Sequence, residues 1–244
     1  MSYRVLKFGG SSVASATNVS RVLDIVEAET KKGCVILVSS AISGCTDALL
    51  SGEETQFQEM ERRHADMVKR LFTGPQRIAL QERMKALFGQ MRQAPADEKV
   101  TFGEIFSTTI LAEKLETEGY RTIWLDSRDL VVKGDEATTY KRIKSAVKAT
   151  QADIFVAPGF ICQEASGKVS TLGRGGSDYS AALYAAAVQA ALPEDVEWEN
   201  GTLCWEETDG FRSLSCALET QPLGAKERTR WIRFELTAVT EEVW

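Results

Sequence analysis

The chain has 244 residues, of which 29 are Lys or Arg and 35 are Asp or Glu, so its formal net charge is -6 at pH 7. This acidic balance disfavours nucleic acid or an anionic membrane as the main partner, and the length suffices for one large α/β domain. No cationic leader precedes a long apolar run, so we expect neither a signal peptide nor a membrane-spanning helix.

Five cysteines are scattered along the chain, at positions 34, 45, 162, 204 and 216. Their number is odd, and they lack the close pairs that are typical of a zinc site. We therefore expect reduced thiols in a cytoplasmic protein and predict no metal-ligating residues.

The first predicted elements form a βαβ unit. A β-rich run at residues 3–8 ends in Gly9-Gly10, apolar residues follow a helical period over residues 17–30, and residues 34–38 form a continuous apolar strand. The two strands should be parallel neighbours, and ligands in such sheets bind beyond the carboxyl ends of the strands. The residues at that edge are Lys7, Gly9, Gly10, Ser39 and Ser40.

Gly9 and Gly10 let the backbone approach a bulky anion, and Lys7 can place a positive charge beside it. On these residues alone, a solvated lysine at a strand end is the commoner alternative. The spacing is not that of a Walker A loop, because no Gly-Lys-Ser/Thr follows the glycines. If the chain binds ATP, it does so by another route.

The next part of the chain is predicted to be mostly helical. Thr46 or Asp47 is expected to cap a short apolar helix, and two charged helices separated by Gly74-Pro75 form an insertion over residues 53–93. The only histidine, His64, is predicted on the polar surface of the first of these helices. We therefore expect no His-based triad and no multi-histidine metal site.

Strands and helices then alternate to about residue 191. The predicted elements are a helix at 100–119, a strand at 121–125, a helix at 138–150 and a strand at 153–157 that ends in Pro158-Gly159-Phe160. Glu104 lies among large apolar residues, so it either faces inward, where a carboxylate requires a partner, or complements the helix dipole. The alternation predicts an α/β fold, a three-layer α/β/α sandwich with a mainly parallel sheet.

A glycine-rich turn at residues 171–178 joins a predicted strand at 168–172 to an alanine-rich helix that runs from Tyr179 to about residue 191. Such a turn directs backbone N–H groups and the positive end of a helix dipole at one point, which suits a phosphate or carboxylate. A turn that only lets strand and helix pack closely is the alternative. Arg174, Ser177 and an N-cap acid, Asp178, favour the anion site.

Five motifs stand in order along the chain: Lys7-Phe-Gly-Gly-Ser-Ser-Val-Ala14, Ser39-Ser-Ala41 with Thr46, Phe102-Gly-Glu104, Pro158-Gly-Phe160 and Leu172-Gly-Arg-Gly-Gly-Ser-Asp-Tyr-Ser-Ala181. Together they resemble the catalytic domain of aspartate kinases, and most of all the kinase half of bifunctional aspartokinase/homoserine dehydrogenases. The resemblance covers about residues 3–197 and implies the amino acid kinase fold, which binds Mg-ATP without a Walker A loop. It also implies transfer of the γ-phosphoryl group of ATP to the β-carboxylate of L-aspartate, the first step of lysine, threonine and methionine biosynthesis.

The resemblance implies roles for individual residues. Arg174 would clamp a carboxylate of the aspartate, and Glu104 would pair with its ammonium group. Further hydrogen bonds to the substrate would come from Ser40, Thr46 and Ser177. The nucleotide would be bound by Lys7, Gly9, Gly10, Ser11 and Gly175. Asp178 would orient Lys7, and these two residues would be the catalytic pair.

The resemblance ends near residue 197. The family continues with a Trp-Thr-Asp-Val-Asp-Gly segment that contacts the nucleotide, where this chain has Trp205-Glu-Glu-Thr-Asp-Gly210. The acids Glu206-Glu207 replace the expected threonine and aspartate, while Asp209 is retained as a nucleotide-binding candidate. A second nucleotide-binding candidate is Lys226, in a Leu-Gly-Ala-Lys run that resembles a phosphate-binding motif of the family; chance similarity is the alternative, because the preceding helix is too short.

We predict that residues 1–197 form the catalytic domain and that residues 198–244 are a divergent, nucleotide-side part of it. The regulatory ligand-binding domains and the dehydrogenase of longer relatives are not expected, and a homodimer is compatible with the resemblance. Three hypotheses follow: an aspartate kinase, another enzyme of this fold acting on a different acceptor, or a catalytically impaired fragment that binds an amino acid or a partner chain. Glu206-Glu207 favour the third, because extra carboxylates repel phosphates.

Overall fold

The computed structural model describes residues 3–188, together with the backbone of five short strands in the rest of the chain. Those strands are β7 (Trp198–Glu199), β8 (Thr202–Leu203), β9 (Phe211–Arg212), β10 (Glu235–Leu236) and β11 (Ala238–Val239). The predicted nucleotide-binding residues Asp209 and Lys226, and the acids Glu206-Glu207, lie outside the described residues.

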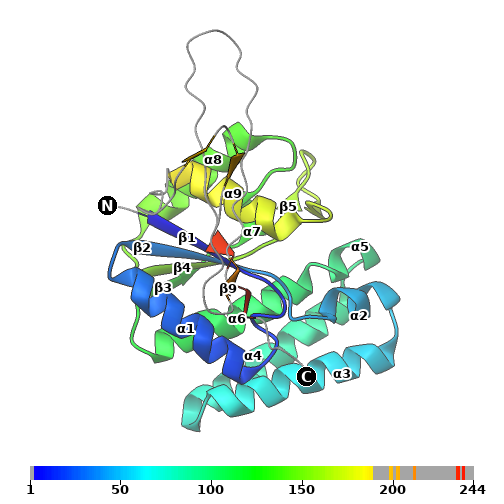
Figure 1. The fold of residues 1–244 in the computed structure, drawn as a ribbon. Helices are drawn as coiled ribbons and strands as arrows, with labels where there is room; N and C mark the ends of the chain where they lie inside the picture. The colour runs from blue at the N-terminus through cyan, green and yellow to red at the C-terminus, as the bar shows by residue number, and fades with distance from the viewer. Residues whose placement is uncertain are drawn as a thin grey trace.

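A parallel sheet forms the centre of the fold (Figure 1). Its strands lie in the order β10-β1-β2-β4-β3, and the members within residues 3–188 are β1 (Tyr3–Phe8), β2 (Cys34–Ser39), β3 (Thr122–Trp124) and β4 (Ile154–Pro158). β1 and β2 pair in parallel from Tyr3 opposite Cys34 to Phe8 opposite Ser39. The predicted parallel neighbours are therefore confirmed, and both strands end at the same edge of the sheet.

Helices cover both faces of this sheet (Figure 1). Because successive side chains of a strand point to opposite faces, Val35 and Leu37 of β2 join one hydrophobic cluster while Ile36 and Val38 join the other. The first cluster includes α1 (Ala16–Thr30) and α6 (Phe102–Thr117), and the second includes α8 (Glu136–Ala149) and α9 (Gly176–Val188). The short α7 (Ser127–Leu130) lies on the second side. The predicted α/β/α sandwich is confirmed.

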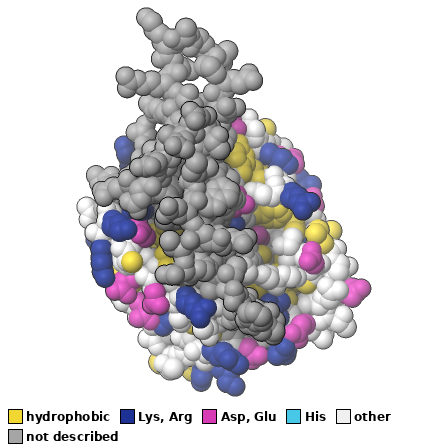
Figure 2. Space-filling view, viewed as in Figure 1, with side chains coloured by type: hydrophobic (Ala, Val, Ile, Leu, Met, Phe, Trp, Pro, Cys, Tyr) yellow, Lys and Arg dark blue, Asp and Glu magenta, His cyan; other side chains and the backbone are white. Residues whose placement is uncertain are grey.

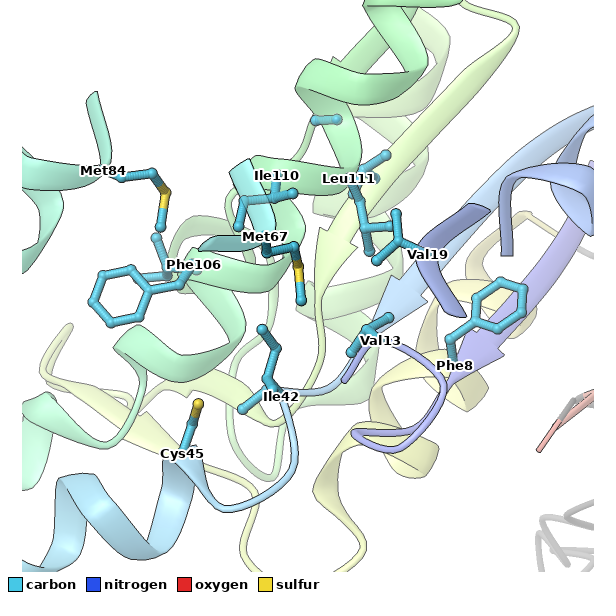
Figure 3. Packing of buried hydrophobic residues seen from close by; sticks show 14 of the residues in the cluster. Phe8, Val13, Val19, Ile42, Cys45, Met67, Met84, Phe106, Ile110 and Leu111 are labelled. Atoms are coloured by element: carbon cyan, nitrogen blue, oxygen red, sulfur yellow. The ribbon is translucent and has the colours of Figure 1, made fainter. Parts of the chain in front are cut away.

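The segment between β2 and α6 adds a further helical layer on the α6 side. It contains α2 (Cys45–Ser51), α3 (Glu54–Leu71), α4 (Gly74–Gln93) and α5 (Ala96–Lys99). Figure 3 shows Met67 of α3, Met84 of α4 and Phe106 of α6 in one cluster with Ile42. Since α3 and α4 cover the side of α6 that faces away from the sheet, residues 102–112 of α6 are all buried.

The prediction that His64 lies on a polar surface is wrong, because the residue is fully buried. Its ring lies against Phe88 and Phe106, with centroid separations of 5.6 and 5.3 Å. The Met60 carbonyl oxygen, which can only accept, lies 2.7 Å from Nδ1, so Nδ1 carries the proton. Phe57, Met60 and Met67 place one apolar stripe on α3, and position 64 falls on it at helical spacing. Burial lowers the pKa of His64 to about 4.

Two predicted helix caps are also wrong. The short helix α2 begins at Cys45 after Gly44, whose φ of 81° is in the left-handed region, and no side chain caps it. Thr46 and Asp47 instead lie in its first turn. Similarly, α9 begins at Gly176, two residues before Asp178, so this acid is in the first turn rather than at the N-cap.

The predicted strand at residues 168–172 exists as β6 (Val169–Thr171), but it lies outside the central sheet. It pairs antiparallel with β5 (Ile161–Gln163) in a hairpin that leads into the glycine-rich turn. The alternation of strands and helices alone does not distinguish such a hairpin from a further parallel strand.

Among the described residues, Cys34, Cys45 and Cys162 are buried free thiols. Burial raises the pKa of each to about 11. On the face shown in Figure 2, basic and acidic side chains are interspersed over the described surface. None of the described helices combines the length and apolar character needed to cross a membrane.

Candidate active site

A pocket of about 340 Å³ opens where β1, β2 and β4 end. Among the described residues, five segments line it: the end of β1 with its glycine turn; residues 40–44; the start of α2; the start of α6; and the corner after β4 together with the turn at residues 173–178. We call residues 40–44 the pocket loop. Nine predicted site residues line this pocket: Lys7, Gly10, Ser40, Thr46, Glu104, Arg174, Gly175, Ser177 and Asp178. Gly9 and Ser11 do not line it, although Gly9 is adjacent to Lys7.

Lys7 and Asp178 form an ion pair across the pocket, with 2.7 Å between Nζ and Oδ1. The lysine side chain is only 9% exposed and the aspartate side chain 31%, so the ammonium group is largely withdrawn from water. A buried ammonium requires such a partner. The pairing arises because the first turn of α9 packs beside β1 (Figure 1).

The glycines of the site serve two distinct purposes. A Cβ on Gly10 would lie 2.6 Å from the Ala41 carbonyl oxygen, and one on Gly159 would lie 2.8 Å from Cβ of Ser177, so both positions require close packing. Gly173 and Gly175 have φ values of 78° and 76° with open space beside them. Packing therefore explains Gly10, while the turn around Arg174 leaves room for a ligand group.

Phe160 lines the pocket, although its place in the Pro158-Gly-Phe160 motif is the only feature of the sequence that singles it out. Its φ of 67° is in the left-handed region, which is unusual for an aromatic residue. The Phe160 N–H donates to Ser180 Oγ at 2.9 Å, and its carbonyl oxygen accepts from the Leu172 N–H at 2.8 Å. Its ring lies so close to Gly176 that a Cβ there would be 2.9 Å from it. Other lining residues that carried no prediction are Ala41, Ile42, Ser43, Gly44, Gly173 and Gly176.

Glu104 faces inward, as one of the two sequence interpretations predicted, and is 3% exposed. Its Oε1 accepts a hydrogen bond from the Ala41 N–H at 3.1 Å, whereas Oε2 has no hydrogen-bond partner among the described residues. Burial raises the pKa of this carboxyl to about 8, although the Ala41 N–H opposes the rise. A buried carboxyl group with one oxygen unsatisfied suits a ligand that brings a positive charge.

The pocket holds groups that suit ligand charges of both signs. Arg174 is exposed and forms no ion pair with a carboxylate of the described chain, so its guanidinium group is available to a ligand. Lys7 and Arg174 suit phosphate or carboxylate groups, while Glu104 suits an ammonium group. The arrangement fits a zwitterionic ligand that carries additional negative charge.

Comparisons with known proteins agree with this geometry. The lysine-sensitive aspartokinase 3 of Escherichia coli is 30% identical over 213 residues, covering 77% of this chain and 47% of that protein. The bifunctional aspartokinase/homoserine dehydrogenase 2 of the same organism is 28% identical over 200 residues, covering 72% of this chain and 25% of that protein. The structure of E. coli aspartokinase III with aspartate and ADP superposes with a TM-score of 0.66 at 27% identity, covering 78% of this chain and 47% of that one.

This chain thus spans about half the length of the aspartokinases it matches and a quarter of the bifunctional relative. The model of the amino acid kinase family matches residues 2–194, which include every element that lines the pocket. The chain therefore belongs to the amino acid kinase family.

Proposed function

We propose that this chain is the catalytic domain of an aspartate kinase. It would transfer the γ-phosphoryl group of ATP to the β-carboxylate of L-aspartate, giving 4-phospho-L-aspartate, the first step towards lysine, threonine and methionine. The observation that carries the proposal is the convergence of Glu104, Arg174 and the Lys7–Asp178 pair on one pocket. The matched relatives named as aspartokinases support it, as does the similarity to an aspartokinase structure in complex with aspartate and ADP.

The acceptor side of the pocket follows from the charges of L-aspartate. Its ammonium group would pair with Glu104, whose Oε2 is the unsatisfied atom, and a carboxylate would be bound by Arg174. Three hydroxyl groups from separate segments would add hydrogen bonds: Ser40, Thr46 and Ser177. The acceptor carboxylate has an ordinary pKa of about 3.9 and is ionised at neutral pH, so the reaction needs no general base.

The phosphate side requires positioning and neutralisation of charge. Lys7, held by Asp178, would lie against the transferring phosphoryl group, and the backbone of four residues would contact the phosphates: Gly9, Gly10, Ser11 and Gly175. The open space beside Gly175 fits such a group. Mg²⁺ would neutralise phosphate charge. Magnesium in kinases is bound through one or two carboxylates together with substrate phosphates rather than by a full set of protein ligands, and the described residues contain no cluster of three potential metal ligands.

The domain assignment belongs to the same proposal. Residues 1–197 would be the catalytic domain, with residues 53–93 as its helical insertion, and residues 198–244 would complete the nucleotide side through Asp209 and Lys226. The enzyme would act in the cytoplasm on small-molecule substrates, and a homodimer is compatible with the proposal.

The experiment that tests the proposal is ATP-dependent formation of aspartyl hydroxamate, in which hydroxylamine traps the acyl phosphate. The full chain is incubated with L-aspartate and Mg-ATP, and the Lys7→Ala variant is the control. We expect product from the wild type and none from the variant. A folded wild-type chain that binds L-aspartate but forms no product would instead support a catalytically impaired fragment. Product formed only with a different acceptor from a panel of carboxylates and carbamate would support another enzyme of this fold.

A further inference from the structure

The pocket loop has no regular secondary structure, so its shape depends on bonds to its neighbours. The Ser40 N–H donates to the Phe8 carbonyl oxygen at 3.0 Å, and the Ser43 N–H donates to the Gly10 carbonyl oxygen at 3.2 Å. From α6, the Ser107 hydroxyl donates to the Ser40 carbonyl oxygen at 2.8 Å, and Glu104 accepts from Ala41. The bonds from the sheet, from the turn after β1 and from α6 therefore hold both peptide groups of Ser40, and at the other end of the loop they hold the Ser43 N–H.

The helical insertion supplies a further bond, at the exposed end of the loop. Arg63 of α3 donates from Nη1 to the Ser43 carbonyl oxygen at 3.1 Å. The same Nη1 would lie 3.7 Å from a Cβ on Gly44, so the guanidinium group covers the Ser43–Gly44 peptide. Gly44 has a left-handed φ and immediately precedes α2, which carries Thr46 into the pocket. The bond thus lies at the point where the pocket loop passes into α2.

The neighbouring Arg62 differs from Arg63 in its partners. Arg62 pairs with Glu59 at 2.6 Å and with Asp66 at 3.1 Å, both on its own helix. Arg63 has no carboxylate partner among the described residues, although it is half-buried. Its charge reaches the start of α2, since Arg63 opposes the rise in the pKa of Cys45 that burial causes, and Cys45 lies between the pocket-lining residues Gly44 and Thr46. The one side-chain hydrogen bond that Arg63 makes among the described residues therefore goes to the pocket loop, although its charge also acts on Glu59 of its own helix.

We propose that Arg63 is a positioning residue for the acidic substrate: it holds the Ser43 carbonyl group, and through it the Ser43–Gly44 turn and Thr46, in the geometry that binds L-aspartate. This inference rests on the proposed function and deepens it, because it assigns the helical insertion a part in substrate binding. Loss of the bond would let the exposed end of the loop rotate at Gly44, while the bonds from the sheet and α6 keep the rest of the pocket in place.

The test compares Arg63→Met with Arg62→Met in the full chain, using titration calorimetry with L-aspartate. Each change removes one arginine charge from adjacent positions of α3, so Arg62→Met controls for net charge. We expect the Kd for L-aspartate to rise about tenfold in Arg63→Met, as for the loss of one charged hydrogen bond, and to stay within about twofold of wild type in Arg62→Met. Arg63→Lys should restore part of the affinity, because a lysine keeps the charge and a donor.

A urea unfolding midpoint separates positioning from a purely structural role. We expect this midpoint to be the same in Arg63→Met and Arg62→Met. The role of Arg63 would be overturned if the two variants had equal Kd values. It would also be overturned if the urea midpoint of Arg63→Met were lower than that of Arg62→Met by enough for partial unfolding to explain its weaker binding. Should Arg63→Met not fold, Arg63→Gln keeps a donor without the charge and takes its place in the comparison. A folded wild-type chain with no affinity for L-aspartate would overturn the proposed function itself.

Discussion

Replacing Glu104 by glutamine should change how the stability of the protein depends on pH. The glutamine side chain would have nearly the same shape as glutamate, and its carbonyl oxygen can still accept the Ala41 N–H. It cannot bind or release a proton near neutral pH. Any difference in pH dependence between the two proteins therefore reports on the Glu104 carboxyl group.

The magnitude follows from the pKa of Glu104, which is 4.5 ordinarily and about 8 in the folded protein. At ~1.36 kcal/mol for each unit of pKa, this difference corresponds to about 5 kcal/mol as an upper bound. Between these two values the folded state holds a proton that the unfolded state has lost. The free energy of unfolding of the wild type should therefore fall as pH rises from about 4.5 to about 8, by an amount that the glutamine variant does not lose.

The assay is urea unfolding of both proteins at about pH 5 and at about pH 8, with stability obtained by linear extrapolation. His64 contributes an opposite trend, but it is present in both proteins and cancels in the difference. Glu116→Gln, which changes an exposed residue near the end of the same helix, controls for the lost formal charge. We expect the glutamine variant to gain several kcal/mol relative to wild type at the higher pH, on the order of the bound above.

A stability difference between Glu104→Gln and wild type that is the same at both pH values would refute the reasoning. It would mean that the carboxyl group is ionised throughout, so the Ala41 N–H and the pocket would stabilise its charge better than its 3% exposure implies.

Three further outcomes are expected. Arg174→Ala should abolish hydroxamate formation with an unchanged unfolding midpoint, and full activity at saturating L-aspartate would contradict its assigned role. In the wild type, the free energy of unfolding should fall as pH drops from about 6.5 to about 4, because the unfolded state binds a proton at His64 that the folded state does not; His64→Leu should reduce this fall. Urea midpoints that run parallel for variant and wild type across that pH range would show that folding excludes no proton from His64. Gly10→Ala should destabilise the protein, since its Cβ would lie 2.6 Å from the Ala41 carbonyl oxygen, whereas Gly89→Ala, in open space on α4, should stabilise it by ~0.5–1 kcal/mol. Thermal unfolding of the two variants tests this, and equal changes in their melting temperatures would exclude the steric argument.

The sheet and its ligand edge were predictable because their pattern is local. A continuous apolar run such as residues 34–38 is typical of a strand buried on both faces, and strand ends in a parallel sheet share an edge. The motif at residues 171–178 likewise places Arg174 and Asp178 on one turn, so their convergence with Lys7 needs only the correct packing of α9 on β1.

The errors and the omissions concern residues whose environment depends on the whole fold. The spacing of Phe57, Met60 and Met67 already puts position 64 on the apolar stripe of α3, but only the packing of α3 against α4 and α6 shows that aromatic rings enclose it. Phe160 adopts a left-handed φ because Ser180, twenty positions later, accepts its N–H. The contact between Arg63 and Ser43 joins a helix to a loop across twenty residues, and no periodicity in the sequence indicates it.

The three buried thiols of the described residues can be used to measure local opening of the protein by chemical modification. Cys45 lies at the pocket loop, whereas Cys34 and Cys162 belong to the cluster under the opposite face of the sheet. A thiol reagent reacts with the thiolate, so each site is protected both by exclusion of the reagent and by the raised pKa. With Cys204 and Cys216 replaced by serine, the rate of modification at Cys45 relative to the other two would distinguish opening of the pocket from unfolding of the whole sandwich.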